Sequence, residues 1–147
     1  MNLSSIISHR KTRGFTLIEI LIVLVIIGIL TGLAIPRFVG ATARAKQVEA
    51  KQILRQIYTM QQTYRFEHDS YWIPALGSKA SAANPRAFAP LGVEIMPQAR
   101  YEYEIRGDRN QFTATATATN LDDDPAVDQW TIDQTGELRI VVNDAVE

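Results

Sequence analysis

An uninterrupted apolar run dominates the first quarter of this chain. From residue 20 to residue 36 no side chain is charged. Read as a helix, the 21 residues from Phe15 to Ile35 measure about 32 Å, close to the roughly 30 Å hydrocarbon thickness of a bilayer. The pattern therefore predicts a membrane-length helix over residues 15–36.

A helical pattern continues over residues 37–72, but here it becomes amphipathic. Apolar side chains recur at spacings of three and four residues, so they share one face of the helix. We expect this face to pack on a globular domain, with the helix ending between Glu67 and Trp72. The apolar face is made of Ala50, Ile53, Ile57, Met60 and Tyr64, and the opposite face of Lys51, Arg55, Gln62 and Arg65.

Alternating apolar and polar residues follow and predict β-structure. Residues 73–99 contain four prolines and are typical of a long connecting loop. Residues 100–147 then alternate in a way that predicts four short strands, at 101–105, 111–119, 129–133 and 138–143. The expected fold class is α+β: one long N-terminal helix packed on a four-stranded antiparallel sheet.

The charges are segregated along the chain although the net charge is only −1. Residues 37–66 carry six bases and one acid, whereas residues 101–147 carry three bases and eleven acids. The basic segment 37–66 of one copy (the stalk) can therefore attract the acidic segment 101–147 of another copy (the head). An acidic head does not favour nucleic-acid binding. The chain has no cysteine, which excludes disulfides and thiolate metal sites.

Catalytic motifs are missing from the sequence. It contains no Ser/His/Asp set, no phosphate-binding loop and no Cys/His cluster, and its histidines, His9 and His68, stand far apart. We therefore expect a protein that is not an enzyme and that carries no organic cofactor.

One carboxylate, Glu19, stands in the first turn of the apolar run. A charge inside a membrane helix costs about 2.5–3.5 kcal/mol on insertion scales, so it requires a partner. A cleaved secretory signal ending near Gly32-Leu33-Ala34 is one alternative, and a simple single-pass anchor is another. Neither alternative explains Glu19.

The segment Arg13-Gly14-Phe15-Thr16-Leu17-Ile18-Glu19 and the apolar run behind it resemble the N-terminus of type IV pilins and type II secretion pseudopilins. The resemblance implies that a prepilin peptidase cuts between Gly14 and Phe15, removing the leader 1–14, and then methylates the Phe15 amine. It also implies that Glu19 pairs with the Phe15 ammonium of a neighbouring subunit during assembly.

We predict packing or bending roles for three further residues of the apolar run. Gly28 and Gly32 form a small-xxx-small pair, which favours close helix packing, although single glycines are also common in membrane helices. Pro36 removes one helical hydrogen bond and should bend the helix. The resemblance implies in addition that the stretch from Gly28 to Pro36 loosens in filaments.

An acidic loop at residues 120–128 is a candidate cation site. Oxygen-rich loops of this kind bind Ca²⁺, although Val127 stands where an EF-hand would have its glycine. A solvated acidic turn without metal is the alternative. The candidate calcium ligands are Asp122, Asp124 and Asp128.

The resemblance implies a function in a filament. We expect a type IV pilus subunit that serves motility or adhesion, with a pseudopilin of type II secretion or a minor pilin in DNA uptake as alternatives. The implied partners are further copies of the chain, the prepilin peptidase and the inner-membrane assembly machinery. The chain would cross the inner membrane once before assembly and lie in a cell-surface pilus or a periplasmic pseudopilus afterwards.

Overall fold

The computed structural model describes residues 14–119, 121 and 126–143, and the side chains of these residues except 35–40. The chain divides into two compact units, Met1–Arg37 and Phe38–Glu147. One helix, α1, runs through Leu17–His68 and contributes to both units.

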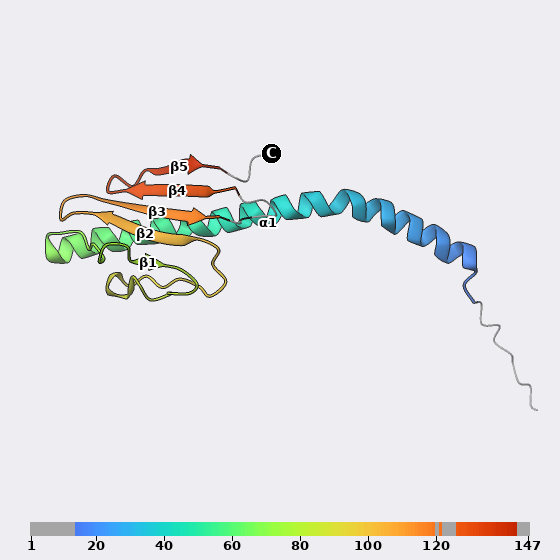
Figure 1. Cartoon of the computed structure of the whole chain (residues 1–147), viewed down its shortest axis with the longest axis horizontal. Coiled ribbons are helices and arrows are strands. Elements are labelled where there is room, and N and C mark those ends of the chain that lie inside the picture. Colours follow the sequence, from blue (N-terminus) through green and yellow to red (C-terminus); the bar gives the residue numbers. More distant parts are fainter. Residues whose placement is uncertain (1–13, 120, 122–125, 144–147) are drawn as a thin grey trace, which may run out of the picture. The chain divides into compact units, whose positions relative to one another are not determined.

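The second unit contains a sheet of five strands in the order β1-β2-β3-β4-β5 (Figure 1). Every neighbouring pair is antiparallel. The α+β fold class is thereby confirmed. The strands are β1 (Lys79–Ala80), β2 (Glu102–Gly107), β3 (Phe112–Ala118), β4 (Asp128–Asp133) and β5 (Leu138–Val142), and a 3-10 helix covers Ala89–Leu91.

The sequence predicted four strands, and the fifth, β1, is a correction. It consists of two residues that pair with Glu104 and Tyr103 of β2. Two residues are too short to show alternation, and β1 lies in the proline-rich segment that was expected to be a connecting loop. Strand β2 also extends through Gly107, which was expected in the turn.

The core of the second unit lies between α1 and the inner face of the sheet. Alternation in β3 is confirmed, since Phe112 and the alanines of that strand are buried while Thr113 is exposed. Small alanine side chains allow the helix to approach the sheet closely. On α1 the buried apolar side chains are Ala43, Ala50, Ile53, Leu54 and Ile57.

The predicted polar face of α1 is only partly exposed. Arg55 is exposed, but the Lys51 ammonium lies 3.8 Å from the centroid of the Trp130 ring. Gln62 donates a 3.3 Å hydrogen bond to the Gln134 carbonyl, and the Arg65 guanidinium lies over the Tyr71 ring. The prediction that these three side chains face away from the sheet was wrong, because long polar side chains lay their stems along neighbouring elements.

Two residues define the C-terminal end of α1, Asp69 through its backbone and Gln61 through its side chain. Asp69 follows the helix with a positive φ of 54°, which is the left-handed conformation that commonly ends helices. Gln61 is fully buried, donates to the Trp72 carbonyl at 2.8 Å and accepts from the Trp72 N–H at 2.9 Å. These bonds turn the chain back toward the sheet.

Candidate assembly site at the start of the helix

The first unit exposes an apolar helix surface. Leu17–Ala34 is long and apolar enough to cross a membrane, by length and composition, and none of it is buried within the chain. Every large apolar side chain of this stretch that is described is about half exposed or more. Burying such a side chain contributes roughly 1.5–3 kcal/mol, so this surface favours lipid or other protein over water.

The Gly14–Phe15 junction lies just outside the helix. Residues 14–16 precede α1 and are not helical, and both Gly14 and Phe15 are exposed. Apart from Gly14 and its chain neighbours, no described residue has an atom within 4 Å of the position that a Cβ on Gly14 would take. A non-helical, exposed peptide bond is accessible to a peptidase, whereas a bond inside the helix would first require unwinding.

Glu19 has a partner within its own chain. Its Oε2 accepts hydrogen bonds from both the N–H and the hydroxyl of Thr16, each at 2.8 Å, and the Glu19 N–H donates to Thr16 Oγ1 at 3.3 Å. This reciprocal arrangement is a capping box, in which a Thr and a Glu three residues later satisfy the free donors of a helix start. Thr16 was missed in the sequence analysis, although the Thr-x-x-Glu spacing carries the signal.

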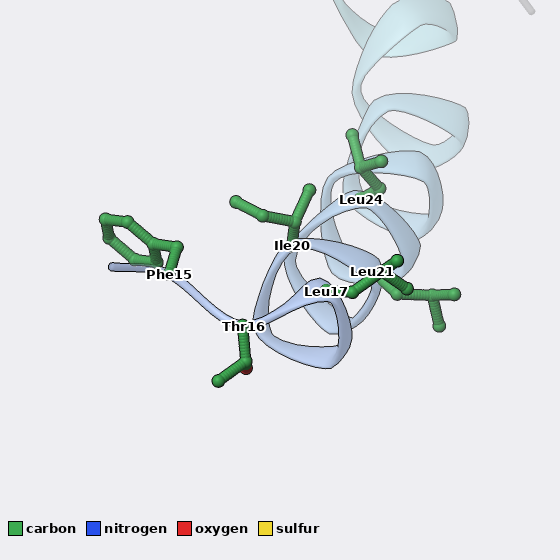
Figure 2. Close-up of a pocket in the computed structure, with 6 residues that line it drawn as sticks. All are labelled: Phe15, Thr16, Leu17, Ile20, Leu21 and Leu24. Carbon is green, nitrogen blue, oxygen red and sulfur yellow. The ribbon is translucent and has the colours of Figure 1, made fainter. Parts of the chain in front are cut away.

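The side chains around this capping box form an open, mainly apolar hollow. Figure 2 shows its six lining residues, which come from the chain before the helix and from its first two turns. Thr16 is the only polar residue among them. The hollow suits apolar side chains or lipid tails, and it is lined by Phe15, Thr16, Leu17, Ile20, Leu21 and Leu24.

Gly28 and Gly32 leave open space on the helix surface. No atom lies within 4 Å of a Cβ built on either glycine, so neither packs against another part of the described chain. The side chain of Pro36 lies outside the described residues. Close packing at the glycines and a bend at the proline therefore stay predictions.

The acidic loop contributes one described candidate ligand, Asp128, because Asp122 and Asp124 lie outside the described residues. Asp128 is fully buried. Its Oδ1 accepts from Gln47 Nε2 at 2.8 Å, and its Oδ2 accepts from the Tyr101 hydroxyl at 2.5 Å and from Trp130 Nε1 at 2.7 Å. Gln47 and Tyr101 were not singled out from the sequence.

These contacts give Asp128 a structural role that the calcium hypothesis did not include. Both of its oxygens already accept hydrogen bonds, and these bonds join α1 and β4 to Tyr101, the residue that precedes β2. In the described ranges no group of three or more histidine and acidic side chains is placed to hold a metal. The calcium hypothesis stays a prediction and now depends mainly on Asp122 and Asp124.

Comparison with known proteins supports the resemblance seen at the N-terminus. Residues 9–35 match the family model described as the prokaryotic N-terminal methylation motif. The type II secretion system core protein G of Aeromonas hydrophila is 31% identical over 96 residues, which cover 60% of this chain and 67% of that protein. The chain belongs to the type IV pilin and type II secretion pseudopilin family.

This chain is also similar to two type IV pilins. The type IV major pilin PilA of Myxococcus xanthus is 46% identical over 82 residues, which cover 56% of this chain and 34% of the relative. The wide-pilus major component PilA4 of Thermus thermophilus is 36% identical over 80 residues, covering 51% and 61%. The chain thus spans less than two thirds of either pilin. No solved structure matches it significantly.

Proposed function

We propose that this chain is the structural subunit of a type IV pilus and that it polymerises into a helical surface filament. The observation that supports this most directly is the N-terminal arrangement. An exposed Gly14–Phe15 bond precedes a wholly unburied apolar helix with a carboxylate in its first turn. A simple membrane anchor needs neither the exposed junction nor the carboxylate.

The chemistry of maturation creates the partner for Glu19. Hydrolysis of the Gly14–Phe15 amide leaves a carboxylate on Gly14 and an amine on Phe15, which is protonated at neutral pH. Methylation of that amine retains its charge. Glu19 Oε2 is engaged by Thr16, so Oε1 is the oxygen left to accept the Phe15 ammonium of a neighbouring copy.

The partners and location follow from this proposal. The precursor crosses the inner membrane once, is processed by a prepilin peptidase and is handed to the inner-membrane assembly machinery. The same apolar surface of Leu17–Ala34 faces lipid before assembly and other helices in the filament core afterwards. The protein acts as a structural element and not as an enzyme.

A type II secretion pseudopilin is the second candidate function. It is favoured by the Aeromonas core protein G, of which this chain covers 67%. A minor pilin in DNA uptake is disfavoured by the acidic C-terminal region, because DNA binding requires basic surface.

Electron microscopy of filaments sheared from producing cells, with mass spectrometry of their subunit, tests the proposal. We expect long filaments whose subunit begins at an N-methylated Phe15. Glu19→Gln should leave cleavage intact and abolish the filaments, whereas Glu67→Gln, an exposed glutamate in the last turn of α1, should change neither. Cleavage at Phe15 without long filaments would favour the pseudopilin. An uncleaved chain, or normal filaments from Glu19→Gln, would contradict the assigned roles.

A further inference from the structure

The first charged residues after the apolar helix are all basic. From residue 20 to residue 48 the only charged side chains are Arg37, Arg44 and Lys46, and all three follow the membrane-length stretch Leu17–Ala34. Bases beside a membrane helix are normally in excess on the cytoplasmic side. The proposed function places the head, and these three bases with it, on the outer side. This exception requires a negatively charged partner there.

Maturation makes the asymmetry sharper. The leader 1–14 carries three bases and no acid, so basic side chains flank the helix on both sides of the membrane before cleavage. Cleavage removes all three leader bases and leaves the new Phe15 ammonium together with the Glu19 carboxylate on that side. The matured chain therefore has its basic side chains near the membrane on the outer side alone.

Arg44 is the member of this basic group that the structure shows to be available. Its side chain is exposed on α1, and among the described residues it has no hydrogen-bond or ion-pair partner. Lys46 differs, because its ammonium donates to the Leu121 carbonyl at 2.5 Å. Arg37 lies within α1, and its side chain is outside the described residues.

Arg44 lies close enough to the span to reach the membrane surface. Ten helical residues separate it from Ala34, the last residue of the span, and ten helical residues rise about 15 Å. The headgroup layer accounts for roughly 5–8 Å of this height. The remaining distance is about one Debye length, which is about 8 Å at physiological ionic strength, and the long arginine side chain shortens it further.

We propose that Arg44, together with Arg37, binds the phosphate groups of anionic phospholipids in the outer leaflet of the membrane that holds the unassembled subunit. Arginine suits this partner, because its planar guanidinium binds two phosphate oxygens at once. Each base near an anionic surface strengthens association about fivefold. The proposal rests on the proposed function for the orientation of the helix, but not for filament formation. The contact holds the matured subunit in place after the leader bases have been removed.

The matured full-length chain in nanodiscs of equal parts phosphatidylcholine and phosphatidylglycerol provides the test. The chain has no cysteine, so Ala45→Cys, at an exposed position beside Arg44, carries a single spin label. The label accelerates the ³¹P relaxation of nearby phosphates, and the two lipids have separate ³¹P signals. We expect the acceleration to be about threefold or more greater for phosphatidylglycerol than for phosphatidylcholine.

Two further variants identify the side chains responsible. Arg37→Gln/Arg44→Gln should bring the ratio of the two accelerations close to one. Arg55→Gln removes another exposed base of α1, eleven residues beyond Arg44, and as the matched control it should leave the ratio unchanged. An unchanged ratio in the double variant, or an equal fall in the Arg55→Gln control, would overturn the proposal, because the charge of the whole helix would then attract the lipid.

The nanodiscs contain only this chain and lipid, so their result does not depend on polymerisation. A ratio close to one for the unmodified chain, from cells that produce normal filaments, would overturn this inference and leave the proposed function intact. The expected ratio from a chain that forms no filaments in cells would support this inference and contradict the proposed function.

Discussion

At the start of α1, Glu19 Oε2 accepts hydrogen bonds from the backbone N–H and the hydroxyl of Thr16, each at 2.8 Å. This pairing means that the carboxylate is not isolated before assembly. Two donors from its own chain offset part of the cost of placing it in a membrane. Assembly then adds a cation to a carboxylate that is already oriented.

Replacing Thr16 tests whether this orientation matters. Thr16→Val removes the hydroxyl while keeping the side-chain shape, and loss of a helix cap costs about 1 kcal/mol. We expect cleavage at Phe15 to persist and filament yield to fall, measured by shearing and immunoblotting. Thr16→Ser retains the hydroxyl and should restore the yield. Equal yields from the valine and serine variants would show that the capping box has no part in assembly.

The hydrogen bonds of Asp128 predict a large effect on the stability of the head. Asp128→Ala would remove the carboxylate that accepts hydrogen bonds from Gln47, Tyr101 and Trp130, and of these Gln47 retains a 2.9 Å bond to Asn143 Oδ1. Unpaired buried donors are costly, so the free energy of unfolding of a fragment 38–147, which contains the whole buried core, should fall by about 3 kcal/mol. Urea unfolding measures it. Asp108→Ala, at an exposed turn, is the control and should cost about 1 kcal/mol at most.

The calcium hypothesis is separable from this structural role of Asp128. If Asp122 and Asp124 supply the ligands, Ca²⁺ should raise the melting temperature of the same fragment by binding only the folded state. The double variant Asp122→Asn/Asp124→Asn should abolish that rise while retaining the bonds of Asp128. Identical melting temperatures of the unmodified fragment in calcium and in chelator would exclude the site.

The structural role of Asp128 was not predicted from the sequence, and there is a physical reason for this. Sequence periodicity predicted the alternating burial in β3 and much of the apolar face of α1, because each pattern is set by residues close together in the sequence of one element. The partners of Asp128 come from α1, from the residue before β2 and from β4, so no single local pattern could predict the set. The same applies to Gln61, whose burial depends on Trp72 folding back against the helix.

The hypothesis for the N-terminal site, by contrast, depends only on residues close together in the sequence. The residues Gly14, Phe15 and Glu19 lie within six positions, and their spacing carries the information. The role of Thr16 was not predicted, because the cost of a carboxylate in a membrane helix suggested a partner for Glu19 outside its own chain. Strand β1 was overlooked because two paired residues leave no periodic signal.

Gly107 should tolerate no side chain. Its φ is +151°, and a Cβ there would lie 2.2 Å from the Gln111 carbonyl oxygen across the β2–β3 turn. Gly107→Ala should lower the free energy of unfolding of the 38–147 fragment by about 2 kcal/mol. Gly77→Ala shares the positive φ but meets no atom within 4 Å, and it should cost about 1 kcal/mol. Equal losses from the two variants would show that the close approach to Gln111 is unimportant.

Tyr103 predicts a specific dependence of stability on pH. The residue is 1% exposed, and its hydroxyl has no hydrogen-bond partner among the described residues. Burial, and secondarily the charge of Glu49, raises the pKa of Tyr103 above its ordinary value. Tyr103→Phe removes the unpaired hydroxyl, so at pH 8 it should stabilise the fragment by about 1 kcal/mol.

The sign of the pH effect follows from the raised pKa. The folded state holds the phenol neutral, whereas the unfolded chain ionises near pH 10. The stability that Tyr103 contributes through this difference is complete below about pH 10 and is lost as the pH rises above it, by about 1.4 kcal/mol per pH unit. Urea unfolding at pH 8 and pH 11 should therefore show a larger loss for the unmodified fragment than for Tyr103→Phe. Tyr64→Phe, at a half-buried position, should lose as much as the unmodified fragment, and an equal loss from Tyr103→Phe would contradict the prediction.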